Sequence, residues 1–173
     1  PLDQTAEPIE LPSFETELSP LDQPYDFRAP DRATDKGAIK SCSLTYLDEP
    51  VSSLTGGESV VLTATYETTS KAPVFAFAIR DPLGEVVCYR DAKAETTTDE
   101  SPTFKAIFRF VIPFLHSSSY VLDIAVFEQH EDDILCIDRK DIAASFDMVT
   151  RHIGGGLANV RLASAVIEVL PDA

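Results

Sequence analysis

The stretch Pro73-Val-Phe-Ala-Phe-Ala-Ile-Arg80, followed directly by Asp81-Pro-Leu-Gly84, decides the fold. Successive side chains of a strand point to opposite faces, so this stretch places Phe75, Phe77 and Ile79 on one face and small alanines on the other. The end of the stretch is typical of a hairpin turn, because proline supplies a fixed dihedral and glycine a positive one. The sequence therefore predicts a strand with one aromatic face, followed by a tight turn.

The same kind of pattern recurs on both sides of this stretch. Short runs rich in Val, Ile, Thr, Phe and Tyr alternate with Gly, Pro, Ser and Asp about every ten residues, which is the all-β pattern. No window has the three- and four-residue spacing of a helix. Nine strands are predicted, at Ile39 to Leu47, Ser59 to Glu67, Val74 to Arg80, Glu85 to Arg90, Thr103 to Ile112, Ser119 to Glu128, Ile134 to Arg139, Ala144 to Val149 and Val160 to Leu170. This number of strands indicates two packed sheets.

Alternation also assigns the faces of the strands. The predicted core comprises Phe75, Phe77 and Ile79 with Val60, Leu62, Ala64, Tyr66, Phe104, Phe108, Phe110, Tyr120, Leu122, Ile124 and Val126. The opposite parity, predicted to face outward, comprises Thr63, Thr65, Glu67, Lys105, Ile107, Arg109, Asp123, Ala125 and Phe127.

Composition limits the classes of function. The 173 residues suit one domain with an appendage. The net charge of −15 repels phosphate backbones and anionic lipid headgroups, so we expect no nucleic acid as a partner. Cys42, Cys88 and Cys136 form neither a zinc spacing nor an even disulfide framework, and we interpret them as reduced core thiols of a cytosolic protein. A chain that starts at Pro1 and contains only Met148 suggests a fragment.

Residues 1–36 differ from the rest of the chain. They hold six of the twelve prolines, with acidic residues between them, which is linker composition. We expect an acidic Pro-rich linker, partly ordered at best, followed by a β-sandwich domain over residues 37–173. The linker nevertheless contains apolar side chains that can dock on a neighbouring surface: Ile9, Leu11, Phe14, Leu18, Tyr25 and Phe27.

Several short sequence motifs occur in a characteristic order along the chain. A Gly-Gly-Glu turn at Gly56 to Glu58 precedes an alternating strand. A second group consists of Pro73, Phe75, Ile79, Arg80, Asp81, Leu83, Gly84 and Val86, and a third of Pro113, Leu115, Tyr120 and Leu122. In this order and spacing the chain resembles, from about Ile39 to Leu170, the carboxy-terminal domain of Wzt proteins, the ATP-binding subunits of O-antigen polysaccharide exporters. It departs from the family pattern at Ser119, where glycine is usual, and at Tyr89 to Asp91.

The resemblance implies an immunoglobulin-like or jelly-roll-like antiparallel sandwich that recognises the finished polysaccharide in the cytoplasm, at the inner face of the bacterial inner membrane. It also implies a homodimer, in some members with the last strand exchanged, and a membrane subunit of the ABC transporter as partner of the full-length protein. Gly154-Gly155-Gly156 is interpreted as a hinge, which permits exchange of the strand after it or its return to its own subunit. No cofactor is expected, since the chain lacks a phosphate-binding Gly-x-x-x-x-Gly-Lys-Ser/Thr loop.

No recognisable catalytic arrangement is present. Ser117, Ser118 and Ser119 beside His116 lack a nucleophile elbow and indicate entry into a strand. Cys88 has no spacing that pairs it with a histidine, and the run from His130 to Asp133 lacks the spacing of a calcium loop. We predict that the domain is not an enzyme and binds no metal.

A neutral glycan needs a few hydrogen-bonding side chains and an apolar or aromatic platform. In an immunoglobulin-like topology, Ala76, Ala78 and Arg80 lie beside Asp123, Ala125 and Phe127, with Cys136 and Asp138 next. The predicted carbohydrate-binding residues are Arg80, Tyr89, Arg90, Asp123, Phe127 and Asp138. The alternatives are an ordinary solvated face or a dimer contact. A sandwich that mediates only protein assembly, as a dimerisation or adaptor domain, is the competing function and predicts a wide apolar patch there.

Overall fold

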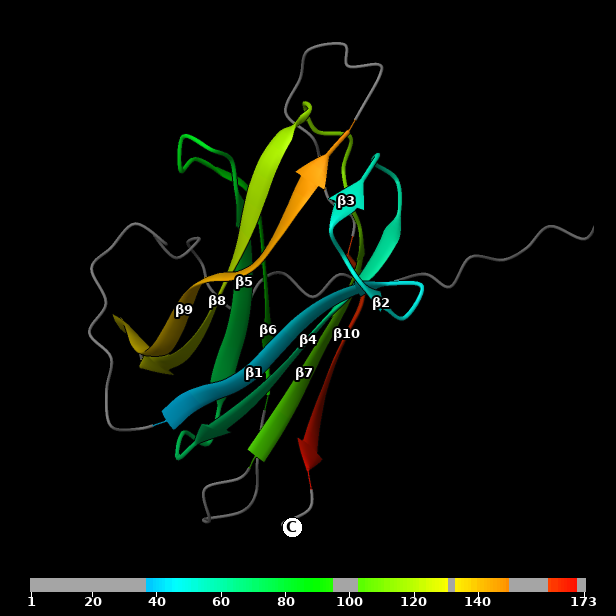
Figure 1. Ribbon diagram of the computed structural model, residues 1–173. Helices are drawn as coiled ribbons and strands as arrows, with labels where there is room; N and C mark the ends of the chain where they lie inside the picture. Colours follow the sequence, from blue (N-terminus) through cyan, green and yellow to red (C-terminus); the bar gives the residue numbers. More distant parts are fainter. Residues whose placement is uncertain (1–36, 95–102, 131–132, 150–161, 171–173) are drawn as a thin grey trace, which may run out of the picture.

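The computed structural model describes residues 37–94, 103–130, 133–149 and 162–170. All regular secondary structure in these ranges is β-strand (Figure 1). The strands are β1 (Gly37–Tyr46), β2 (Glu49–Pro50), β3 (Ser53–Leu54), β4 (Ser59–Thr68), β5 (Pro73–Arg80), β6 (Val86–Lys93), β7 (Thr103–Val111), β8 (Ser118–His130), β9 (Asp133–Met148) and β10 (Leu162–Leu170). The predicted all-β fold is confirmed.

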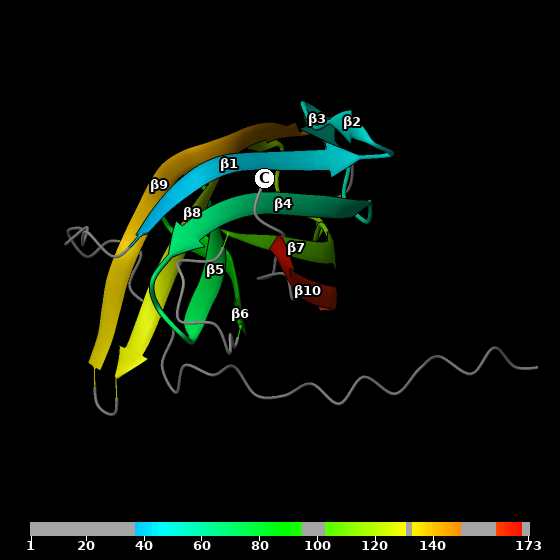
Figure 2. The ribbon, with the colours of Figure 1, turned by 90° about the horizontal axis from the view of Figure 1, so that it is seen from below.

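The strands form two five-stranded sheets, in the orders β10-β7-β4-β1-β2 and β3-β9-β8-β5-β6. All pairs are antiparallel except β3 with β9, which are parallel. Strand β9 also contacts β1 of the other sheet and runs beside it along one side of the sandwich (Figure 2). The last strand, β10, pairs with β7 of the same chain.

The core lies between the two sheets and contains every residue that alternation assigned to it. Phe77 of β5 stacks on Phe110 of β7, with 4.7 Å between ring centroids, and meets Phe108 edge-on at 5.2 Å. Tyr66 and Phe104 flank Phe75, at 4.4 Å and 5.7 Å. These aromatic contacts join the two sheets through β5, and buried aromatic pairs stabilise a core beyond their buried area.

Three details of the strand prediction were wrong. The predicted strands at 134–139 and 144–149 are one continuous strand, β9, and the two-residue strands β2 and β3 were not predicted. The interruption in β9 is a real irregularity, because the pairing with β8 shifts register opposite Leu122/Ile124 and again opposite Val126/Phe127. Ile142 has a φ of 52°, which is unusual for a β-branched residue. Such bulges interrupt strict alternation without ending a strand.

Two turns have the predicted chemistry. Between β5 and β6, Asp81 accepts hydrogen bonds from the amides of Leu83 and Glu85 at 2.9 Å and 2.8 Å, and Gly84 has a φ of 84°. Before β4, Glu58 accepts hydrogen bonds from the amides of Thr55 and Gly56, both at 2.7 Å. Gly56 has a φ of 99°, and a Cβ there would lie 2.6 Å from the Phe114 ring, so only glycine fits this turn.

The Glu58 turn predicts a pH-dependent contribution to stability. Burial raises the pKa of Glu58, but the hydrogen bonds from Thr55 and Gly56 outweigh it, so its pKa lies below the ordinary 4.5. A lowered folded-state pKa stabilises the fold above the ordinary value, and this contribution is lost as the pH falls through the folded-state pKa. Glu58→Gln should lower the free energy of unfolding at neutral pH by about 1 kcal/mol, allowing for solvent screening. Urea unfolding at several pH values should show this difference vanish in acid. An equal loss at all pH values would contradict the prediction.

Tyr66 supplies a second test of the core. Its side chain is 1% exposed and, within the described part of the chain, its hydroxyl has no hydrogen-bond partner. Removing an unsatisfied buried hydroxyl is close to neutral, so Tyr66→Phe should leave the free energy of unfolding unchanged or raise it. The matched control is Tyr120→Phe, because the Tyr120 hydroxyl donates to the carbonyl oxygen of His116 at 3.1 Å. The control should lose about 1 kcal/mol. A comparable loss for Tyr66→Phe would contradict the prediction.

Candidate functional site

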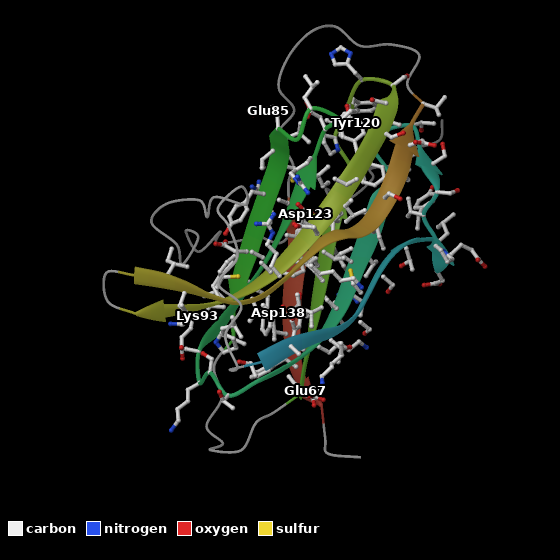
Figure 3. The ribbon with its side chains drawn as sticks, turned by 60° about the vertical axis from the view of Figure 1, so that its left-hand side comes forward. Glu67, Glu85, Lys93, Tyr120, Asp123 and Asp138 are labelled. Carbon is white, nitrogen blue, oxygen red and sulfur yellow. The ribbon has the colours of Figure 1, made fainter. Side chains whose placement is uncertain are left out.

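The candidate site is the outer face of the sheet that contains β5 and β8, the face that points away from the other sheet (Figure 3). The register pairs Val74 with Phe127, Ala76 with Ala125, and Ala78 with Asp123. Strand β9 adds Cys136 opposite Phe127. The predicted adjacency of these residues is therefore confirmed. Six of the side chains form a cluster of their own, the outer apolar set: Val74, Ala76, Ala78, Ala125, Phe127 and Cys136.

The predicted solvent exposure of this face was wrong. Asp123, Ala125 and Phe127 are each 0% exposed, and Cys136 is 6% exposed. Strand β5 is thus buried on both faces over its whole length except Arg80. Alternation separates the two faces of a strand, but it does not reveal whether a second layer covers the outer one.

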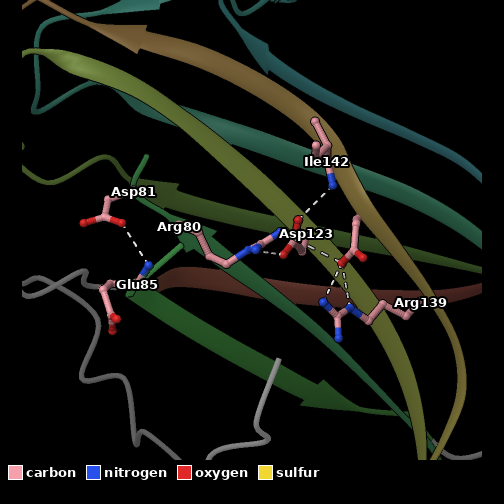
Figure 4. Close-up of polar contacts among 7 residues, drawn as sticks. Arg80, Asp81, Glu85, Asp123, Arg139 and Ile142 are labelled. Atoms are coloured by element: carbon pink, nitrogen blue, oxygen red, sulfur yellow. Dashed lines mark hydrogen bonds and ion pairs between the residues drawn. The ribbon is translucent and has the colours of Figure 1, made fainter. Parts of the chain in front are cut away.

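A charged pair lies at one end of the outer apolar set (Figure 4). The Arg80 Nε atom lies 2.5 Å from Oδ2 of Asp123, and the other carboxylate oxygen of Asp123 accepts the backbone N–H of Ile142 at 2.8 Å. Both oxygens of Asp123 are therefore engaged. The close contact with Asp123 raises the pKa of Arg80 and outweighs the opposite effect of burial. Asp123 thus holds Arg80 in place rather than offering a carboxylate to a ligand.

Two residues of β9 extend this pair into a network that sequence reasoning missed. Arg139 donates from Nε to Oδ1 of Asp141 at 2.7 Å, and its Nη2 atom lies 2.6 Å from the same oxygen. The same oxygen lies 4.0 Å from Nη2 of Arg80, so Asp141 stands between the two guanidinium groups. Its side chain is 51% exposed. An exposed carboxylate held between two arginines is a hydrogen-bond acceptor fixed in position.

Tyr89 and Arg90 of β6 point in different directions. Tyr89 pairs with Ala78 and packs on the outer apolar set, and its hydroxyl donates to Asp91 at 3.1 Å. Arg90 pairs with Phe77, a core residue, and its Nη1 atom donates to the carbonyl oxygen of Tyr89 at 2.8 Å. Tyr89 therefore belongs to the outer face. The side chain of Arg90 leaves β6 on the opposite face, the one that faces the other sheet.

Asp138 does not lie beside Arg80, contrary to the expected arrangement. Its Oδ2 atom accepts a hydrogen bond from the backbone N–H of Ile39 at 2.7 Å, and its Oδ1 atom accepts one from the backbone N–H of Arg139 at 2.8 Å. The bulge opposite Val126/Phe127 changes the parity of β9, so Asp138 turns toward β1 of the other sheet. Asp138 therefore links the two sheets at the side of the sandwich where β9 and β1 are in contact.

The sequence contained a signal for Arg139 and Asp141. Charges of opposite sign two residues apart in a strand lie on one face. This signal was lost because residues 140–143 were interpreted as a connection between two strands. Asp91, the partner of Tyr89, was likewise missed just past the predicted end of its strand.

The described residues offer little for metal binding or for a nucleophile. They contain no group of three His, Cys, Asp or Glu side chains that could hold a metal ion. Burial raises the pKa of the Cys88 thiol to about 11, which makes it a poor nucleophile. The serine run leads into β8 as predicted, and Ser119 donates to Asp147 at 2.6 Å. In the described ranges, no helix has the length and apolar character needed to cross a bilayer.

The architecture and site define a two-sheet β-sandwich domain with a polar network at one end of an outer face. The family model described as "Wzt C-terminal domain" matches residues 30–160. The chain therefore belongs to the Wzt C-terminal domain family, a non-catalytic domain of a component of the O-antigen ABC transporter. No curated protein sequence matches significantly. Among solved structures, the chain resembles "Crystal structure of the C-terminal domain of wzt", with a TM-score of 0.58, 12% identity, and coverage of 73% of this chain and 81% of that one.

The network predicts unequal costs for removing its two carboxylates. Asp123→Ala leaves a partly buried guanidinium and the Ile142 amide without their acceptor, and should lower the free energy of unfolding by about 3 kcal/mol. Asp141→Ala removes a half-exposed carboxylate and should cost less than about 1 kcal/mol. Chemical denaturation of both variants at neutral pH measures the difference. Equal costs would show that Asp123 does not position Arg80 in the way described.

Proposed function

We propose that this domain binds O-antigen polysaccharide without catalysis in the cytoplasm and couples recognition of the finished glycan to export by the ABC transporter. Membership of the Wzt C-terminal domain family carries the proposal. The homodimer and the contact with the transporter's membrane subunit belong to the same proposal.

The polar end of the outer face supplies suitable chemistry for a sugar. Arg80 is 21% exposed and presents several N–H donors in a fixed fork, while Asp141 presents acceptors. Tyr89 adds a half-buried ring on a floor of small alanines. Arg80, Tyr89 and Asp141 are the contacts we propose, with Asp123 and Phe127 as their support. Arg90 and Asp138 drop out of the proposed site, because their hydrogen bonds direct them elsewhere.

A competing function needs apolar side chains that are open to a partner. The outer apolar set is buried, but Leu47 and Phe114, at 77% and 63% exposure, are large apolar side chains open to such a contact. A dimerisation or adaptor domain without glycan binding therefore remains the second candidate. The two candidates differ in whether purified glycan binds.

Titration of the purified chain with O-polysaccharide is the decisive experiment. We expect binding of the polysaccharide from the strain that supplies this sequence, and weaker or no binding of one from an unrelated strain. Absence of binding to either would remove the proposal and leave the assembly domain. Equal binding of both would contradict recognition of a particular glycan.

Matched variants test the proposed contacts. Asp141→Asn removes a charged acceptor and should weaken glycan binding about tenfold, the effect of losing one charge-assisted hydrogen bond. The control is Glu67→Gln, which changes another half-exposed carboxylate. Glu67 lies 2.6 Å from Lys40, and both belong to the sheet that does not carry the proposed site. Glu67→Gln should bind as the unchanged chain does. Equal weakening in both variants would point to charge alone and contradict the proposed contact.

A further inference from the structure

The turn between β1 and β2 has an unusual conformation for its sequence. Tyr46 pairs with Glu49, so Leu47 and Asp48 alone form the turn, and their φ angles are positive, at 50° and 64°. Two-residue hairpin turns with two positive φ angles favour Asn-Gly, because these residues adopt that conformation readily. A leucine at the first position is strained, since its side chain crowds the backbone there. The chain thus keeps Leu47 in this turn at some loss of stability.

Burial does not compensate for this strain. The Leu47 side chain is 77% exposed, and that of its neighbour Tyr46 is 37% exposed. Figures 1 and 2 show the turn projecting at the edge of the sandwich, away from β5 and β6. A single exposed leucine is common on protein surfaces, but a strained backbone conformation is a sign of function. Strain and exposure together indicate that Leu47 makes a contact outside the chain.

The turn between β5 and β6 shows that an exposed leucine does not require such strain. Leu83 is 87% exposed, and the positive φ of its turn belongs to Gly84. In the part of the chain that the structure describes, the residues other than glycine with a positive φ are Leu47, Asp48 and Ile142. Leu83 is therefore a matched control, because it is an exposed leucine in an unstrained turn.

The surroundings of the β1–β2 turn are acidic. Asp48 and Glu49 are exposed, and so is Asp147, whose backbone N–H donates to the carbonyl oxygen of Ser52 at 3.0 Å. Residues 46–58 include neither Lys nor Arg, and the whole chain has a net charge of −15. Carboxylates around an apolar side chain attract a basic protein surface and repel anionic lipid headgroups. Two copies of this turn would also repel each other.

We propose that residues 46–49, here named the docking turn, bind a basic protein segment. Apolar side chains of that segment cover Leu47, and its Lys or Arg side chains meet Asp48 and Glu49. The docking turn belongs to the sheet of β4 and β7, whereas Arg80 and Asp141 lie on the other sheet. A protein can therefore bind here while a glycan occupies the proposed site, and the inference goes beyond the proposed function without depending on it.

Two substitutions separate the exposed leucine from the strain. Leu47→Asn relaxes the turn and removes the apolar contact, so it should raise Tm by about 3 °C and weaken binding about tenfold. Asp48→Gly also relaxes the turn but keeps Leu47, so it should raise Tm and weaken binding by no more than about threefold. The probe is a fluorescent amphipathic peptide of leucine and lysine, titrated at physiological salt and followed by anisotropy. A residue with a purely structural role would not gain stability when substituted.

The control variant is Leu83→Ser, which should bind the peptide as the unchanged chain does. A peptide with glutamate in place of lysine should not bind. Equal binding of the basic peptide by the unchanged chain and by Leu47→Asn, or a lower Tm in Leu47→Asn, would overturn the proposal. Binding to phosphatidylglycerol vesicles that Leu47→Asn abolishes would identify a membrane site instead. Sedimentation that shows a dimer lost in Leu47→Asn would assign the turn to a second copy, which also contradicts a basic partner.

Discussion

The fold depends on burial of β5 on both of its faces. Toward the other sheet, Phe75, Phe77 and Ile79 are each 0% exposed and supply the aromatic contacts between the sheets. Toward the outside, Ala76 and Ala78 are equally buried. A strand in this position needs large side chains on one face and small ones on the other, since small side chains permit close approach of a second layer. The alternation of phenylalanine and alanine in this strand satisfies both demands.

The charged end of β5 imposes a second constraint, because a charge is costly on a buried face unless it is paired. Asp123 is fully buried and balances Arg80, while its second oxygen accepts the Ile142 amide. That hydrogen bond fixes the irregular part of β9, where the positive φ of Ile142 interrupts the pairing. The irregularity in turn places Asp141 between two arginines. Polar groups thus converge here because one buried carboxylate needs partners.

Every residue that alternation assigned to the core lies there, but alternation missed others, such as Leu44, Ile137 and Phe146. It succeeded where strands are regular, as in β4, β5 and β7, because parity alone separates their faces. It failed along β9, where the register shift opposite Val126/Phe127 reverses the parity, so Asp138 turned toward β1 and Arg139 took the outer position. Burial of the outer face could not be predicted from parity, because parity separates the two faces of a strand without showing which of them solvent reaches. Tyr89 and Arg90 were predicted together at one end of the site, but β6 is regular there and places them on opposite faces.

The polar network and the outer apolar set divide one face between stability and the proposed recognition. Val74, Ala76 and Phe127 are buried and contribute apolar contacts to the stability of the sheet. Arg80 and Asp141 lie at the end of this set and keep 21% and 51% of their side chains exposed. Asp123 holds Arg80, and Arg139 holds Asp141, so both polar groups are fixed before a ligand arrives. Groups that are fixed in advance lose less conformational freedom on binding, so a buried carboxylate that stabilises the fold also prepares the exposed end of this face for a ligand.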